Sequence, residues 1–170
     1  KGCEIIIESV RKLKNNFNKM ILLAGPLTGS NYEIKIKKLI GDYNLQNKLI
    51  LSKGLYDDYK WGAIQASKAM LLPSHGENFG VSLVESLSLG KPVITTNKVN
   101  IWKVIDKYKA GICVNDNVNS FTKALEKFNK FKKKKLDKLR TNSLNCFRKN
   151  FDLSSTKNSL GNMLKKNINN

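Results

Sequence analysis

The sequence predicts an α/β fold in which helices cover both faces of a doubly wound parallel sheet. Short apolar runs alternate along the chain with longer stretches whose apolar residues recur at helical spacing. The clearest unit runs from Leu71 to Ile94: an apolar run, a polar loop, an amphipathic stretch, and a second apolar run after Gly90 and Pro92. That order is typical of a parallel crossover, which leaves the loop at the carboxyl end of the first strand.

The first half of the chain is expected to supply two strands and three helices. Helices are predicted at residues 1–16, 32–43 and 58–67, because their apolar residues form stripes. The run MILLA at residues 20–24 predicts a buried strand, and a second strand is expected at 48–51. In the helix at 58–67 we expect Trp61 and Ile64 to face the core.

The second half begins with a strand near Ala69 and the crossover described above. Its helix is expected to present Val81, Val84 and Leu87 to the core, with Leu83 as a further candidate, and to end at Gly90 as a left-handed cap. A helix at 99–107 and a strand at 111–114 follow, giving five strands in all. Residues 1–116 thus form the parallel core of a single domain, and residues 117–170 its C-terminal helices.

The loop at the centre of this unit has the features of a phosphate site. Unpaired N–H groups and the positive end of a helix dipole favour an anion at a helix start. Here those groups belong to Asn78, Phe79, Gly80 and Val81. Glu77 precedes them and Glu85 follows. Since a carboxylate accepts hydrogen bonds in pairs, each could hold two neighbouring sugar hydroxyls on either side of a diphosphate.

The segment GENFGVSLVESLSLGKPVI, with seven residues between Glu77 and Glu85, resembles the E-x7-E signature of the retaining glycosyltransferases of family GT4. The spacing alone would be weak evidence for this family. The preceding apolar strand, Gly80 after the aromatic Phe79 and the GKPVI return make the resemblance specific. It implies the GT-B architecture of two Rossmann-like domains, of which this chain is the second, the donor domain.

The resemblance also implies a reaction. Glu85 would hold the ribose hydroxyls of a nucleoside diphosphate sugar, and Glu77, as a catalytic residue, the hydroxyls of the sugar. A hexosyl-type group would be transferred with retention to a glycan, lipid or other acceptor, in cell-surface polysaccharide or glycolipid synthesis. The acceptor would lie on an absent amino-terminal domain, so this chain alone is expected to bind the donor without transferring the sugar.

Two further segments acquire roles from the resemblance. Lys1, followed by Gly2, stands where the family has a Lys that contacts the donor phosphates; the alternative is a mobile, solvated end residue. The loop after the second strand would lie against the nucleotide base through Gly54, Leu55 and Tyr56, and plain turn chemistry is the alternative there.

By the same resemblance, the first and central strand of the sheet is missing, because it would lie upstream of Lys1. The abrupt start without Met also suggests a fragment. We therefore expect a gap or weakened pairing between the strand at Met20 and the strand at Ala69. A continuous sheet would contradict this expectation.

The net charge of +18 indicates an alternative class of function: a basic module that binds anionic membrane or nucleic acid without catalysis. From Lys127 onward there are thirteen Lys and Arg against two Asp. We interpret the run Lys132–Lys135 as a solvated helical face, with peripheral membrane contact as the first alternative. Nucleic acid is not expected, because no aromatic-interleaved RNA motif is present. A Rossmann-like interaction domain without a donor site is a third hypothesis.

No cofactor or metal is expected, because the chain has no D-x-D motif and its three cysteines lack zinc spacing. His75, the single histidine, is expected to be polar surface. The cysteine usage and the lack of a membrane-length apolar run favour a cytoplasmic protein, with peripheral contact at the inner membrane face as an alternative.

Overall fold

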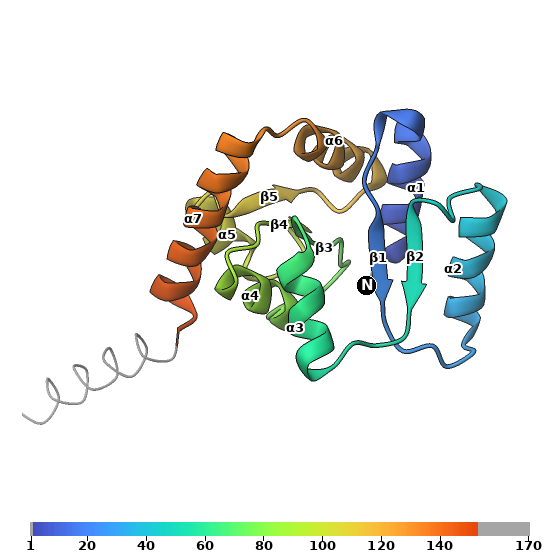
Figure 1. The fold of residues 1–170 in the computed structure, drawn as a ribbon, viewed down its shortest axis with the longest axis horizontal. Helices are drawn as coiled ribbons and strands as arrows, with labels where there is room; N and C mark the ends of the chain where they lie inside the picture. The colour runs from blue at the N-terminus through green and yellow to red at the C-terminus, as the bar shows by residue number, and fades with distance from the viewer. Residues whose placement is uncertain (1, 153–170) are drawn as a thin grey trace, which may run out of the picture.

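The structure, a computed structural model, describes residues 2–152. Within this range the elements are α1 (Cys3–Leu13), η1 (Lys14–Asn16), β1 (Ile21–Ala24), α2 (Asn31–Asp42), β2 (Leu49–Ser52), α3 (Asp57–Ala66), β3 (Met70–Leu72), α4 (Val81–Ser88), β4 (Val93–Thr96), α5 (Trp102–Lys107), β5 (Gly111–Val114), α6 (Val118–Asn129) and α7 (Lys133–Asn150). Strands and helices alternate up to β5, and two helices follow (Figure 1).

The strands form two separate parallel sheets. β1 pairs with β2, with Ile21 opposite Leu49, and β3, β4 and β5 pair in that order, with Ile94 opposite Leu71 and Ile112. Figure 1 shows the β1–β2 pair standing apart from the other three strands. No strand ladder joins β1 to β3 within residues 2–152. The predicted gap in the sheet is therefore confirmed.

Helices pack on both faces of this split sheet, which confirms the predicted fold class. One core joins α1, α2 and α6 to β1 and β2, and a second joins α4, α5 and α7 to β3 and β4. β4 is buried along its whole length, with Val93 in the second core and Ile94 in the first. Successive strand residues point to opposite faces, so β4 lies between the two helical layers.

The prediction that residues 20–24 form a fully buried strand is wrong. β1 begins at Ile21, and its residues are alternately buried and exposed, with Met20 71% and Leu22 46% exposed. Ile21 and Leu23 face the first core, while Leu22 lies on the opposite face. The run MILLA carries no polar residue that would have marked an open face.

Two helix faces also differ from the prediction. Val81 is 60% exposed, contrary to the prediction, whereas Leu83 and Leu87 are fully buried in the second core as expected. Trp61 is 39% exposed, whereas Ile64 is buried as predicted. Neighbouring positions on a helix differ by about 100° in direction, so an apolar residue at a helix start need not share the core-facing stripe.

The last described helix, α7, closes the second core. α7 packs against α4 and α5, and the hydroxyl of Ser143 donates to the Ala110 carbonyl oxygen at 3.2 Å. Lys132–Lys135 are exposed at the start of α7, as expected for a solvated face. The helix predicted beyond Leu153 lies outside the described residues. Between residues 2 and 152, no helix has both the length and the apolar character that a membrane span requires.

Candidate functional site

The loop between β3 and α4 is held against β4 by two buried threonines. The hydroxyl of Thr95 donates to the Leu72 carbonyl oxygen at 2.8 Å, and that of Thr96 donates to the Ser74 carbonyl oxygen at 2.5 Å. Both threonines are fully buried. The side chains of β4 thus bond to carbonyls at the end of β3 and in the loop that follows it, and they fix where the loop leaves the sheet.

Glu77 is fixed by its backbone. Its N–H donates to the Lys98 carbonyl oxygen at 3.1 Å, and its carbonyl accepts from the Asn100 N–H at 3.0 Å. These bonds make a parallel bridge between Glu77 and Val99. Glu77 itself is half-buried and lines an open depression of about 520 Å³ together with Gly76, Asn78, Lys98 and Asn100.

Gly80 sets the start of α4. It is the N-cap residue, with φ 68° and ψ 57°, in the left-handed region that favours glycine. A Cβ at this position would lie 3.1 Å from Val99 Cγ1 and 3.4 Å from Leu83 Cδ1. At this turn a side chain would be strained by the positive φ and would lie tightly against Val99. The first N–H groups of the helix, which have no intrahelical acceptor, begin at this turn.

Asn78 and Phe79 are exposed on the approach to this turn. The Asn78 Oδ1 accepts from Asn100 Nδ2 at 3.5 Å. The ring of Phe79 is 47% exposed and meets Phe151 edge to face, with centroids 5.9 Å apart. Both residues thus flank the glycine turn without covering it.

Glu85 lies in the second turn of α4 and forms an ion pair with a residue that sequence reasoning did not identify. Lys60 Nζ lies 2.5 Å from Glu85 Oε1, and the two side chains are 33% and 21% exposed. Lys60 comes from the first turn of α3. Its pairing with Glu85 brings the start of α3 against α4.

The predicted base-contacting loop immediately precedes α3, the helix whose Lys60 pairs with Glu85. Gly54, Leu55 and Tyr56 connect β2 to α3, and the Lys60 N–H donates to the Tyr56 carbonyl oxygen at 3.2 Å. The Tyr56 ring folds back over Gly54, since a Cβ on Gly54 would lie 2.9 Å from the Tyr56 hydroxyl. The structure thus brings together two segments that are more than twenty residues apart in the sequence.

Lys1 lies outside the described residues, but its neighbour Gly2 is at the site. Gly2 has φ 74° and caps α1, and a Cβ there would lie 1.9 Å from the Pro73 carbonyl oxygen. The backbone at Gly2 therefore lies directly against the backbone at Pro73. The start of α1 lies against the loop that carries Glu77.

The other titratable groups do not form a second reactive centre among the described residues. His75 Nδ1 lies 3.0 Å from both carboxylate oxygens of Asp116, which joins the β3–α4 loop to the β5–α6 loop. Burial raises the pKa of the Cys113 thiol to about 12 and that of Cys146 to about 11, so both stay protonated at neutral pH. No three His, Cys, Asp or Glu of residues 2–152 are grouped as metal ligands would be.

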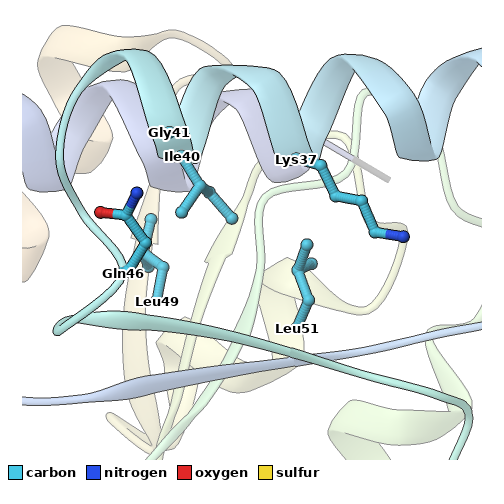
Figure 2. A pocket seen from close by; sticks show the side chains of 6 residues that line it. All are labelled: Lys37, Ile40, Gly41, Gln46, Leu49 and Leu51. Carbon is cyan, nitrogen blue, oxygen red and sulfur yellow. The ribbon is translucent and has the colours of Figure 1, made fainter.

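A second depression, of about 250 Å³, lies away from these residues between α2 and β2. Figure 2 shows it lined by Lys37, Ile40, Gly41, Gln46, Leu49 and Leu51. Lys37 is 2.5 Å from Glu33 Oε1 in an ion pair along α2. None of the predicted site residues lines this depression.

Sequence reasoning missed three residues that the structure places at the site. Lys60 follows Tyr56 by four residues, so helical spacing would have put it one turn beyond the loop, but nothing local indicates its partner. Lys98 and Asn100 were assigned to a turn and a helix. Their contacts with Glu77 and Asn78 cross between two loops, and no local pattern predicts them.

Comparison with known proteins gives a family match over most of the chain. The model of the family described as "Glycosyl transferases group 1" matches residues 1–145. An uncharacterised glycosyltransferase of Methanocaldococcus jannaschii is 29% identical over 131 residues, which are 76% of this chain and 35% of that protein. A poly(glycerol-phosphate) alpha-glucosyltransferase of Bacillus subtilis is 44% identical over 68 residues, which are 40% of this chain and 10% of that protein.

Solved structures share the fold. A crystal structure of HepE of Anabaena in complex with UDP superposes with a TM-score of 0.81 at 18% sequence identity. The matched region is 98% of this chain and 45% of the HepE chain. The chain therefore spans less than half the length of this structure and about a third of the archaeal relative.

Proposed function

The chain belongs to the group 1 family of glycosyl transferases, and from this we propose that it is the donor domain of a retaining GT4-type glycosyltransferase. In this proposal it binds a nucleoside diphosphate sugar for transfer of a hexosyl-type group. Glu77 and Glu85 are the two carboxylates of the E-x7-E motif.

The observation that carries this proposal is the arrangement at the start of α4. A left-handed glycine turn, packed tightly against Val99 and Leu83, begins a helix at the carboxyl end of a parallel strand. Glu77 lies before the turn and Glu85 one turn into the helix, paired with Lys60 of α3. A diphosphate at the helix start would have one carboxylate on each side.

Each group has a part in the proposed reaction. Cleavage of the bond from the sugar to the diphosphate builds negative charge on the leaving group. The N–H groups of residues 78–81 and the helix dipole would stabilise that charge, as preorganised donors do. Glu85 would accept hydrogen bonds from the ribose, and Glu77 from the sugar, so that the anomeric carbon is held in place. Lys1 would add a cation at the phosphates, next to the contact of Gly2 with Pro73.

The acceptor in this proposal is a glycan or lipid of a cell-surface polysaccharide or glycolipid pathway, bound by a second domain. The match to a poly(glycerol-phosphate) glucosyltransferase supports this class of acceptor. The protein would work in the cytoplasm, without a metal ion. Chelation should therefore leave donor binding unchanged.

The experiment is calorimetric titration of the chain with UDP, GDP and ADP, beside Glu85→Gln. We expect one nucleotide to bind selectively and the substitution to weaken it roughly tenfold, the scale of a lost charge-assisted hydrogen bond. Circular dichroism would establish that both proteins are folded. Failure of the folded wild-type chain to bind any of the three would contradict the proposal.

A matched variant separates this proposal from a basic binding module. Changing all four residues of the Lys132–Lys135 run to Gln removes four exposed positive charges at the start of α7. Since these four side chains are exposed, where water and salt screen their charges, nucleotide affinity should stay within about twofold. If the four lysines, and not Glu85, controlled binding, the site would be the basic face.

A further inference from the structure

Among residues 2–152, Lys60 is the cation that pairs with Glu85. Its ammonium lies 2.5 Å from Oε1, and both side chains are more than half shielded, at 33% and 21% exposure. Water and salt screen such a pair less than an exposed one. The contact joins α3 to α4 at the level of the predicted donor-binding loop.

A second contact fixes the ammonium. Lys60 Nζ also lies 4.6 Å from the centroid of the Trp61 ring, within the range of a cation–π interaction. Lys60 is therefore held between an indole and a carboxylate. A long lysine side chain held at two points has lost much of its rotamer freedom and can orient the group it binds.

The pair leaves half of the carboxylate open. Lys60 binds Oε1, and Oε2 of Glu85 makes no hydrogen bond with any other residue from 2 to 152. Each oxygen of an ionised carboxylate can accept two hydrogen bonds. Glu85 thus keeps one full oxygen and part of the other for hydroxyl donors.

We propose that Lys60 is a positioning residue for the nucleotide: it holds the Glu85 carboxylate in the orientation that accepts both ribose hydroxyls. This inference rests on the proposed function, in which Glu85 binds ribose. Lys60 acts through Glu85 and not on the phosphates. Substitution of Lys60 should therefore weaken the binding only of ligands that have the two ribose hydroxyls.

The test compares two ligands on one variant. The nucleoside diphosphate that the wild-type chain binds, from UDP, GDP and ADP, is titrated beside its 2′,3′-dideoxy analogue. Lys60→Met should weaken the ribonucleotide roughly tenfold, the scale of one charge-assisted hydrogen bond, and leave the dideoxy analogue within about twofold. Lys60→Arg should restore most of the loss, because Arg keeps the charge and the donor.

A control and the Glu85 variant make each result decisive. Lys68→Met removes the same charge from an exposed position after α3 and should leave both affinities unchanged. Equal weakening of both ligands by Lys60→Met would overturn the inference, since it would mean a phosphate contact or a general structural role. No change, or tighter ribonucleotide binding, would overturn it as well. If the folded wild-type chain binds no nucleotide, or if Glu85→Gln has no effect, the proposed function itself fails.

Discussion

At the scale of single residues, Gly80 shows how one backbone conformation determines the site. Its φ of 68° places the first N–H groups of α4 at the carboxyl end of β3, and a Cβ here would lie tightly against Val99 and Leu83. An L side chain in this conformation costs about 1–2 kcal/mol. The glycine therefore combines a turn that the chain needs with an anion-accessible helix start.

We expect Gly80→Ala to lower the free energy of unfolding by about 1–2 kcal/mol, because alanine is strained at positive φ. Nucleotide affinity should fall as well, because relief of that strain moves the helix start. Urea denaturation monitored by circular dichroism would measure the first effect and calorimetry the second.

Gly62→Ala is the matched control for that substitution. Gly62 lies inside α3, and a Cβ there would have no atom within 4 Å. Alanine should stabilise this helix by up to about 1 kcal/mol. Equal effects of the two substitutions would show that the left-handed turn at Gly80 is not needed.

At the scale of elements, α2 has a well-formed start. The Ser30 hydroxyl accepts from the Glu33 N–H at 3.3 Å, and the Glu33 carboxylate accepts from the Gly29 N–H at 2.9 Å. Lys37 lies one turn further on and binds the other Glu33 oxygen. This reciprocal arrangement resembles a capping box. Ser30→Ala should therefore cost about 1 kcal/mol in urea denaturation.

The stabilising effect of Glu33 should depend on pH. The Lys37 ammonium and the Gly29 N–H lower the pKa of Glu33 from its ordinary value of 4.5. A lowered carboxyl pKa in the folded state adds stability above the unfolded value, and this is lost as pH falls through the folded value. The stability difference between wild type and Glu33→Gln should thus be full near neutral pH and shrink below 4.5.

Glu126→Gln is the control for the pH series. Glu126 pairs with Lys130 on α6, but the two side chains are 44% and 71% exposed. Exposed pairs of this kind contribute about 0–1 kcal/mol. A pH-independent difference for Glu33→Gln would contradict the capping interpretation.

Element types were predictable from the sequence because each apolar run or stripe is a local signal. The strand at 111–114 and the left-handed cap at Gly90 were predicted correctly. The predicted start of α5 was wrong, because the helix begins at Trp102 and not near residue 99. Val99 and Asn100 are instead drawn into the bridge with Glu77, a contact between segments that are 22 residues apart.

The helix start at Gly80 was predictable from the sequence, but the contacts around it were not. The helix start and its flanking glutamates follow from the local pattern around Gly80. The Lys60–Glu85 pair depends on how α3 crosses α4, and the Thr96 bond to Ser74 depends on strand register. Such contacts are products of tertiary packing, which spacing along one segment does not specify.

At the scale of the whole molecule, the split sheet should make stability uneven. β4 has a hydrogen-bonded strand on each side and core on both faces. β1 and β2 form a two-stranded sheet, and Leu22 and Ile50 are exposed on its open face. A pair of strands has marginal stability by itself, so β1 and β2 depend on α1 and α2 on one face.

Native-state hydrogen exchange should therefore show two levels of protection. We expect the amides of β1 and β2 to open at a lower free energy than those of β4, because their opening breaks one strand pairing and exposes one packed face. β5 is the internal control, since it is an edge strand within the three-stranded sheet. If β5 matched β4 while β1 and β2 exchanged faster, the cause would be the gap in the sheet and not edge position. Equal protection of all five strands would mean that the two sheets open as one cooperative unit despite the gap.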